Sequence, residues 1–401
     1  MSLLEPGSTR AQGVADDAAL VAAMVRVELA WYDVLVAQGV ASTGQAELVS
    51  SAAARWDPDV KALIDDGETA GNPVVPCLAA LRREVDDAGA AAHLHRGLTS
   101  QDVLDTALML LARGALVRAG DDLLAMGDRL AELAVEHRAT VMVGRTLTQY
   151  AVPVTFGLVC AQWLTGIHDA LDDVNATSSS LPVQCGGAAG TLSLAADVLP
   201  DAGAAPQALA AALDLVAPAL PWHTRRRPVT RLGDCLVGVI DSVAPVAAEV
   251  ALLSRPEIGE LSEGRVPGRG GSSTMPHKLN PVLSVLVRAV ALQAPFLGAQ
   301  LHLAAAQAVD QRPDGAWHAE WPSLARLLRL TVSATSQARE LLDGLHVHAD
   351  VMSARAHTAV GELLAERDGL DALAHDSDPA SYLGLTDRFV DSALDRWRAR
   401  G

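Results

Sequence analysis

Five long apolar segments dominate this chain and leave it few ways to fold. Residues 102–137, 153–178, 230–254, 281–311 and 322–345 are rich in alanine, leucine and valine, and none shows the apolar–polar alternation of a strand. Alanine and leucine at this density favour helix. The first segment alone would be about 54 Å long at a rise of about 1.5 Å per residue. One small domain cannot cover helices of this length, so the sequence predicts an all-α fold with a long bundle completed by other subunits.

Shorter helical stretches flank these segments and define the expected domains. Residues 1–101 are broken repeatedly by glycine and proline, which predicts a separate N-terminal helical domain. Residues 102–345 would form the central bundle and the core of an oligomer. From residue 346 to 401 the pattern becomes more polar and rich in alanine, which predicts a short C-terminal helical domain.

Composition excludes several classes of function. The 31 Lys and Arg residues against 48 Asp and Glu residues give a formal charge of −17, which disfavours nucleic acid and anionic membranes as partners. The four cysteines form no C-x-x-C pair, so neither a metal site nor a disulfide framework is indicated. The uncharged run at 289–309 contains three glutamines and a histidine, and is interpreted as a buried helix of a soluble protein. No signal sequence is visible, and a reducing cytoplasm is expected.

The most informative local pattern is the stretch GRGGSSTMPHKLNP at residues 268–281. Its glycines predict a loop that bends sharply and moves, and this loop carries the hydroxyls of Ser272 and Ser273. Lys278 and Asn280 follow, and Pro281 would open the next helix. A hydroxyl, a cation and an amide at a helix N-terminus suit a carboxylate ligand. The alternative is an ordinary glycine–serine linker.

Two further clusters carry polar side chains at element boundaries. Thr99 and Ser100 precede the first long helix within the run HRGLTSQD, where the simplest interpretation is a helix cap. The segment GRTLTQ at 144–149 contributes Arg145, Thr146 and Gln149.

The loop resembles the signature GSS-x-MP-x-K-x-NP of the fumarase/aspartase superfamily. The resemblance implies a helical homotetramer that eliminates or adds groups beta to a carboxylate, with sites shared between subunits. Ser272 would then be the catalytic hydroxyl, with Ser273 adjacent and not distinguished from it. No cofactor is implied, because Lys and Arg can supply the positive field. Residues implied to bind substrate are His95, Thr99, Ser100, Arg145, Thr146, Gln149, Arg226, Lys278, Asn280 and Arg312.

Leu147 departs from the superfamily pattern. It stands where members that release amines or water often carry a histidine that protonates the departing group. Leucine transfers no proton, so the leaving group should be stable as an anion. A carboxylate meets this demand because its conjugate acid has a pKa near 4. The alternative is that Leu147 only packs and that an acid such as His95 acts instead.

Other segments narrow the resemblance to one branch. The runs QCGGAAGT, PWHTRR and GAWHAEW resemble the cycloisomerase branch, whose members lactonise 3-carboxy-cis,cis-muconate in protocatechuate catabolism. Two alternatives stay open: an adenylosuccinate-type lyase, and a non-catalytic helical scaffold. Arg226 could also belong to a surface basic cluster. Trp317, His318 and Trp321 are interpreted equally well as core packing and as substrate contacts.

Overall fold

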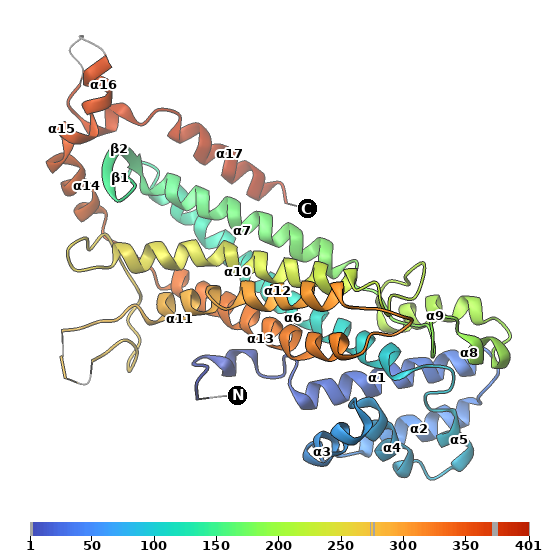
Figure 1. Cartoon of the computed structure of the whole chain (residues 1–401). Coiled ribbons are helices and arrows are strands. Elements are labelled where there is room, and N and C mark those ends of the chain that lie inside the picture. Colours follow the sequence, from blue (N-terminus) through green and yellow to red (C-terminus); the bar gives the residue numbers. More distant parts are fainter. Residues whose placement is uncertain (1–2, 273, 276, 371–375, 401) are drawn as a thin grey trace. The chain divides into compact units, whose positions relative to one another are not determined.

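The computed structural model describes residues 3–272, 274–275, 277–370 and 376–400. Helices make up most of these residues, which confirms the predicted all-α class (Figure 1). The chain forms two compact units, each assembled from three separate stretches. Unit 1 comprises residues 1–118, 175–237 and 295–332, and unit 2 comprises residues 119–174, 238–294 and 333–401. The domain boundaries expected at residues 101 and 345 stay predictions.

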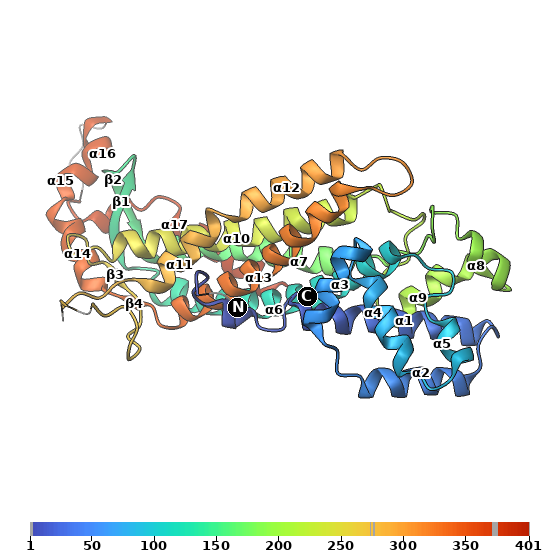
Figure 2. The same cartoon turned by 60° about the horizontal axis from the view of Figure 1, so that its bottom comes forward.

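Five helices begin unit 1: α1 (Asp17–Ala37), α2 (Thr43–Arg55), α3 (Val60–Ala70), α4 (Val74–Glu84) and α5 (Ala88–His93). Four of them begin at a side chain that accepts a backbone N–H of the first turn, namely Asp16, Ser42, Asp59 and Asp87. Such caps satisfy N–H groups that have no partner within the helix. Helix α2 contacts α1, α4 and α5, as Figure 2 shows.

The remainder of unit 1 comes from distant stretches of chain. Helix α6 (Ser100–Glu136) begins in this unit and continues into unit 2. The short helices α8 (Ser193–Val198) and α9 (Ala205–Leu213) follow, and α9 contacts α1. Helix α10 (Arg227–Leu253) and helix α13 (Gly315–Asp343) also begin here, and α12 (Ala294–Ala306) lies almost wholly in this unit. The starts of α6, α10 and α13 thus belong to the same unit.

Unit 2 contains the other parts of α6, α10 and α13, most of α7 (Phe156–Ser178), and α11 (Val282–Ala291). It also holds the antiparallel pairs β1 (Val141–Thr146) with β2 (Gln149–Thr155), and β3 (Leu261–Ser262) with β4 (His346–Val347). Helices α14 (Ala349–Thr358) and α15 (Val360–Leu363) contact the β1–β2 hairpin. Helices α16 (Ala365–Leu370) and α17 (Thr386–Arg398) follow. Short 3-10 turns lie at Ser8–Ala11, Ala202–Ala204 and Pro379–Tyr382.

The expectation that the chain contains no strand was wrong at the β1–β2 hairpin. Leu147 and Thr148 form its two-residue turn, and both have positive φ values, 48° and 72°. Two positive φ values are required by the turn type that matches the twist of paired strands. Glycine or asparagine usually supplies them, and their absence here hid the turn.

The expected helix at 281–311 is divided into α11 and α12. Pro295 follows the break; it lacks a backbone N–H, and the residue before a proline avoids helical geometry. Of the three glutamines in this segment, Gln300 lies within α12, whereas Gln293 lies in the break and Gln307 follows the end of α12. Helix α13 begins at Gly315 rather than 322, so the run GAWHAEW forms its first two turns.

Helix α17 closes unit 2 through one apolar stripe. Val390, Leu394 and Trp397 on this stripe are buried. The Trp397 indole lies over Gly127 of α6, where a Cβ atom would come within 2.1 Å of the ring. Its Nε1 donates a hydrogen bond to Asp128 Oδ1 at 2.9 Å. A glycine in mid-helix thus makes room for the last tryptophan of the chain.

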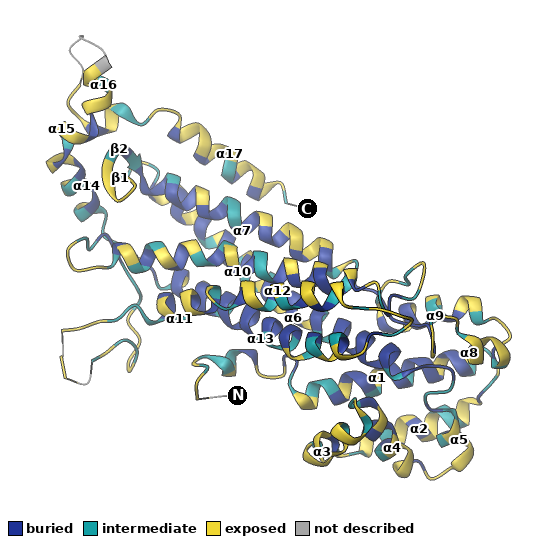
Figure 3. Ribbon diagram, in the orientation of Figure 1, coloured by how far each residue is buried: buried dark blue, intermediate teal, exposed yellow. Residues whose placement is uncertain are grey.

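Burial separates the long helices from their connections. Figure 3 shows α6, α10 and α13 buried along much of their length, whereas none of the described residues from 263 to 279 is buried. Two segments, Arg227–Leu253 and Val282–Ala306, are long and apolar enough to cross a membrane by length and composition. The core helices of a soluble helical bundle share that composition.

Candidate functional site

The N-terminus of α6 is organised around the buried carboxylate of Asp102. Its Oδ2 accepts the backbone N–H groups of Thr99 at 3.0 Å and Gly187 at 2.8 Å. Its Oδ1 accepts Gly186 N–H at 2.9 Å and faces His223 Nε2 at 2.8 Å. Asp102 lies in the first turn, where a negative charge is favoured by the helix dipole. Asp102 therefore joins the loop that carries the predicted Thr99–Ser100 pair to residues 186–187 and to His223.

Arg312 meets this loop from the segment before α13. Its Nη1 donates to Thr99 Oγ1 at 2.8 Å, and its Nε donates to Gln101 Oε1 at 3.4 Å. Ser100 is partly exposed and begins the helix beside them. The structure thus brings together three predicted residues, Thr99, Ser100 and Arg312. Two hydroxyls, a guanidinium and a helix N-terminus provide the donors that a carboxylate needs.

Arg226, also predicted to bind substrate, is enclosed within the protein. Its Nη1 and Nη2 donate to Asp105 at 2.7 and 2.9 Å. Its Nε and Nη2 donate to Glu320, and Nη1 also reaches the Trp222 carbonyl at 3.5 Å. The side chain is fully buried, and all five N–H donors are engaged. No donor is left for substrate, so in this chain Arg226 supports other residues.

The group around Arg226 contains two carboxylates and one cation, all buried. Burial raises the pKa of Glu320, and the hydrogen bonds from Arg226 oppose that rise. Burial alone would lower the pKa of Arg226, but Asp105 and Glu320 raise it. Trp317 completes the group, because its Nε1 donates to Asp105 Oδ1 at 3.0 Å. The contacts join the starts of α6 and α13 to the segment before α10.

His95 is held by a carboxylate that sequence reasoning did not identify. Glu28 of α1 is buried, and its two oxygens bind the His95 backbone N–H at 2.8 Å and Nδ1 at 2.7 Å. Trp31 and Tyr32 on the same helix donate to the carbonyls of Arg96 and Ala90. His95 adopts a φ of 65°, which is costly for a residue other than glycine. The ring is therefore fixed through Nδ1, and its Nε2 has no hydrogen-bond partner among the described residues.

In unit 2 the hairpin carries Arg145, Thr146 and Gln149. Arg145 forms a two-point ion pair with Glu260, at 3.1 and 2.7 Å. Thr146 and Gln149 are exposed beside the turn, and Gln149 Nε2 donates to Thr148 Oγ1 at 3.2 Å. Arg145 and Thr146 line a cavity of about 700 Å³. The predicted residues of the hairpin therefore differ in their availability to a ligand. Arg145 is paired with Glu260, whereas Thr146 and Gln149 are exposed to solvent.

The 268–281 loop is closed where Gly270 meets Asn280, which we call its neck. Its described residues between these two are exposed or partly exposed. The Asn280 backbone N–H and side-chain Nδ2 both donate to the Gly270 carbonyl, at 2.8 and 3.0 Å. Ser272 Oγ accepts the backbone N–H groups of Thr274 and Met275, at 3.4 and 3.2 Å. Lys278 is exposed. Ser273, the second predicted catalytic residue, lies outside the described residues.

The start of α11 differs from the expected carboxylate site. Glu263 accepts the backbone N–H groups of Leu283 at 3.2 Å and Ser284 at 2.8 Å. These first-turn donors are the ones that the sequence analysis assigned to a ligand. A carboxylate of the chain itself occupies them, which leaves Ser272 and Lys278 as the groups that the loop presents.

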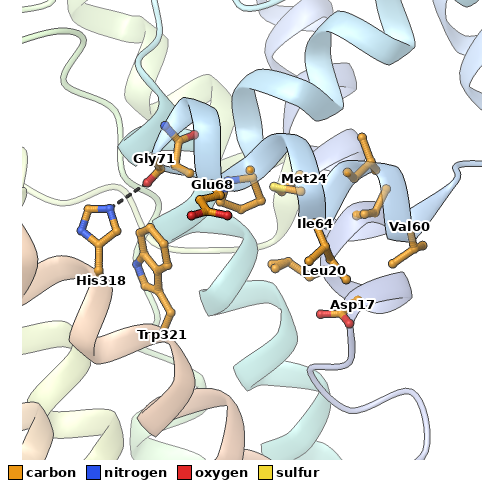
Figure 4. A pocket seen from close by; sticks show the side chains of 14 residues that line it. Asp17, Leu20, Met24, Val60, Ile64, Glu68, Gly71, His318 and Trp321 are labelled. Atoms are coloured by element: carbon orange, nitrogen blue, oxygen red, sulfur yellow. Dashed lines mark hydrogen bonds between the residues drawn. The ribbon is translucent and has the colours of Figure 1, made fainter.

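A further cavity lies away from these loops. Figure 4 shows a cavity of about 420 Å³ in unit 1, lined mainly by apolar residues of α1 and α3. His318 and Trp321 form its wall, and His318 Nε2 lies 2.7 Å from the Gly71 carbonyl. Among the described residues, no group of three or more His, Cys, Asp or Glu side chains could hold a metal ion. The apolar lining does not suit a polycarboxylate.

Sequence reasoning missed the acids that support the site. Asp102 was interpreted only as a helix cap, and Asp105, Glu320, Glu28 and Glu263 received no role. Their spacing gives one signal, because Asp102 and Asp105 lie one helical turn apart and so share a face of α6. Their partners come from distant segments, which no local pattern indicates.

Comparison with known proteins shows the family of the chain. The family described as "Lyase" matches residues 66–295. Nitrosuccinate lyase of Streptomyces davaonensis is 42% identical over 376 residues, which cover 91% of this chain and 79% of that protein. A 3-carboxy-cis,cis-muconate cycloisomerase of Bradyrhizobium diazoefficiens is 36% identical over 371 residues, with 91% and 81% covered.

Solved structures show the same fold. The 3-carboxy-cis,cis-muconate lactonizing enzyme of Pseudomonas putida aligns with a TM-score of 0.85 and 28% identity, covering 94% of each chain. A lyase family that matches more than half of the chain and relatives that match most of it settle the class. The chain therefore belongs to the fumarase/aspartase superfamily and is an enzyme of the lyase or cycloisomerase type.

Proposed function

We propose that this enzyme lactonises 3-carboxy-cis,cis-muconate to γ-carboxymuconolactone, as a step of protocatechuate catabolism. The observation that carries the proposal is Leu147, which stands at the hairpin tip with 96% of its side chain exposed. At this position the superfamily resemblance implies an imidazole that protonates the leaving group. An alkyl side chain restricts the chemistry to groups that depart, or attack, as stable anions. A carboxylate within the same molecule is such a group.

The reaction needs one carbon–oxygen bond and one proton. A substrate carboxylate attacks the alkene carbon, and the electron pair of the double bond passes to the neighbouring carboxyl group as an enediolate. Ser272 would then donate its hydroxyl proton to the carbanion carbon, with Lys278 stabilising the resulting alkoxide. Thr99, Ser100 and Arg312 would hold a further carboxylate. Attack within one molecule also benefits from the high effective concentration of tethered reactants.

A second candidate follows from the relative that is 42% identical, a nitrosuccinate lyase. Loss of nitrite from nitrosuccinate breaks a carbon–nitrogen bond beta to a carboxylate. Nitrite is the anion of an acid of moderate strength, so its departure needs no proton donor. Leu147 is therefore compatible with both reactions, whereas an adenylosuccinate-type reaction releases a nitrogen base that needs a proton.

Three parallel assays separate these candidates. Purified enzyme is incubated with 3-carboxy-cis,cis-muconate, nitrosuccinate and adenylosuccinate, and diene absorbance, nitrite and purine absorbance are followed. We expect loss of the diene absorbance to be fastest by kcat/KM. Nitrite release with an unchanged diene would replace the proposal by the second candidate. Preferred cleavage of adenylosuccinate would contradict the argument from Leu147.

We further propose that the enzyme is a cytoplasmic homotetramer whose sites take residues from more than one subunit. Leu147, Phe296 and Leu292 expose 96%, 78% and 76% of their surface, and large exposed apolar side chains mark interaction surfaces. All four cysteines are buried, which suits a protein of a reducing compartment. Light scattering coupled to gel filtration should give four times the chain mass of 41.7 kDa. A monomer that is fully active would contradict the shared site.

A further inference from the structure

Trp317 is the side chain that joins Arg312 to the buried acid–base group of unit 1. It is 3% exposed and lies in the first turn of α13, five residues after Arg312. Its Nε1 donates to Asp105 Oδ1 at 3.0 Å. The guanidinium carbon of Arg312 lies 5.8 Å from its ring centroid, within the range of a cation–π contact. Trp317 therefore contacts both Asp105, which serves as its anchor in the buried group, and Arg312, a cation predicted to bind substrate.

The anchor itself cannot move freely. Asp105 accepts two hydrogen bonds from Arg226, and Arg226 in turn binds Glu320. Glu320 lies one turn after Trp317 on α13, so this helix reaches Asp105 of α6 directly through Trp317 and indirectly through Arg226. Thr99, the partner of Arg312, precedes the first turn of the same α6. The Trp317–Asp105 hydrogen bond therefore fixes the start of α13, and with it Arg312, relative to the helix that carries Thr99.

Trp321 provides a natural comparison. It lies one turn further along α13, and its ring centroid is 4.6 Å from that of Trp317. Its Nε1 is buried and has no hydrogen-bond partner among the residues that the structure describes. It lines the apolar cavity of Figure 4 and forms part of that cavity's wall. The two indoles thus share a helix and an environment but differ in whether the N–H is used.

We propose that Trp317 is a positioning residue for substrate binding: it holds the Arg312 guanidinium at the N-terminus of α6, where one carboxylate of the substrate docks. This inference rests on the proposed function, because it assumes a polycarboxylate substrate. It goes beyond that function by assigning a role to a buried side chain that touches no reacting atom. Arg226, Asp105 and Glu320 then act through Trp317 rather than on substrate.

The test compares Trp317→Phe with Trp321→Phe. Phenylalanine keeps an aromatic face in both positions and removes only the indole N–H and part of the ring. Because a hydrogen bond to a charged acceptor is lost at one position alone, we expect Trp317→Phe to raise KM roughly ten-fold. Its kcat should stay within about two-fold, since Ser272 is untouched. Trp321→Phe should change KM by less than about two-fold.

Binding of tricarballylate, a tricarboxylate without an alkene, separates this inference from the proposed reaction. Its Kd, measured by calorimetry, should rise about ten-fold in Trp317→Phe whichever polycarboxylate the enzyme converts. Wild-type enzyme that binds tricarballylate but leaves 3-carboxy-cis,cis-muconate unchanged would contradict the function alone. Equal Kd values for wild type and Trp317→Phe would overturn the positioning role.

A double-mutant cycle shows whether Trp317 acts through Arg312. In an Arg312→Gln background, Trp317→Phe should add less than about a two-fold change in the tricarballylate Kd. A full ten-fold effect in that background would mean that Trp317 acts by another route, and would overturn the proposal. If Trp317→Phe yields no folded protein, Trp317→Tyr replaces it, because this change also keeps an aromatic face and removes the indole N–H while leaving the Asp105–Arg226 ion pair intact.

Discussion

The start of α6 and the 268–281 loop both carry predicted site residues, yet they differ in how far they are buried and in how many contacts hold them. Asp102 at the start of α6 is buried and holds four partners, and Arg312 lies against Thr99. In the loop no described residue from 263 to 279 is buried, and the hydroxyl of Ser272 accepts only from its own neighbours. The binding groups are thus fixed before substrate arrives. The hydroxyl that is proposed to transfer the proton lies instead on a segment whose described residues are exposed or partly exposed.

The largest expected effect concerns the 268–281 loop and its proposed role in proton transfer. Ser272→Ala removes the hydroxyl that is proposed to transfer the proton, so kcat should fall roughly 10³-fold. KM and the thermal midpoint should change little, because the loop is exposed. Thr274→Ala in the same loop is the control and should keep wild-type kcat in a steady-state assay. Equal activity of the two variants would move the proton transfer to another residue.

Replacing Arg226 tests how strongly the buried group beside the start of α6 stabilises the protein. Replacing it by glutamine leaves two buried carboxylates without their cation, which should cost about 3–5 kcal/mol of unfolding free energy. Urea denaturation measures this loss. Arg225→Gln, at an exposed neighbour that lines a different cavity, should cost less than about 0.5 kcal/mol. A variant at Arg226 that keeps full stability but loses substrate affinity would restore the role first predicted for it.

Gly270 controls the neck of the loop. It has a φ of 73°, and a Cβ atom there would lie 2.6 Å from the Asn280 carbonyl oxygen. Gly270→Ala should therefore separate the neck and lower kcat about ten-fold, by misplacing Ser272. Gly271→Ala is the matched control, because nothing lies within 4 Å of its added Cβ. Similar kinetics for both alanine variants would show that the neck does not position the hydroxyl.

The smallest effect concerns pH. Burial raises the pKa of Glu320 above its ordinary value of 4.5, so the folded protein holds this proton more tightly than the unfolded chain does. The corresponding stability is present below about pH 4.5 and is lost as pH rises through the higher folded pKa. Glu320→Gln cannot ionise, so its stability deficit relative to wild type should be smaller at neutral pH than near pH 4.5. Urea midpoints at the two pH values measure it, and a deficit that grows with pH would contradict the sign.

The sequence predicted the helical class because composition and periodicity are properties of whole segments. Thr99, Ser100 and Arg312 could be placed in one site through the resemblance of short motifs. The hairpin was missed because Leu147 and Thr148 adopt a turn that their residue types rarely favour. The internal partners of Arg226 and Arg145 could not be predicted either, since a charge on a motif looks the same whether its partner is a substrate or a distant glutamate. Those partners come from folding, which brings together residues far apart in sequence.

The seat of Trp397 on Gly127 has a consequence for how the protein is made. The ribosome adds this tryptophan long after it has made α6, because about 270 residues separate Gly127 from Trp397. Until then the surface of α6 at Gly127 stays open to water, and the packing of unit 2 is incomplete.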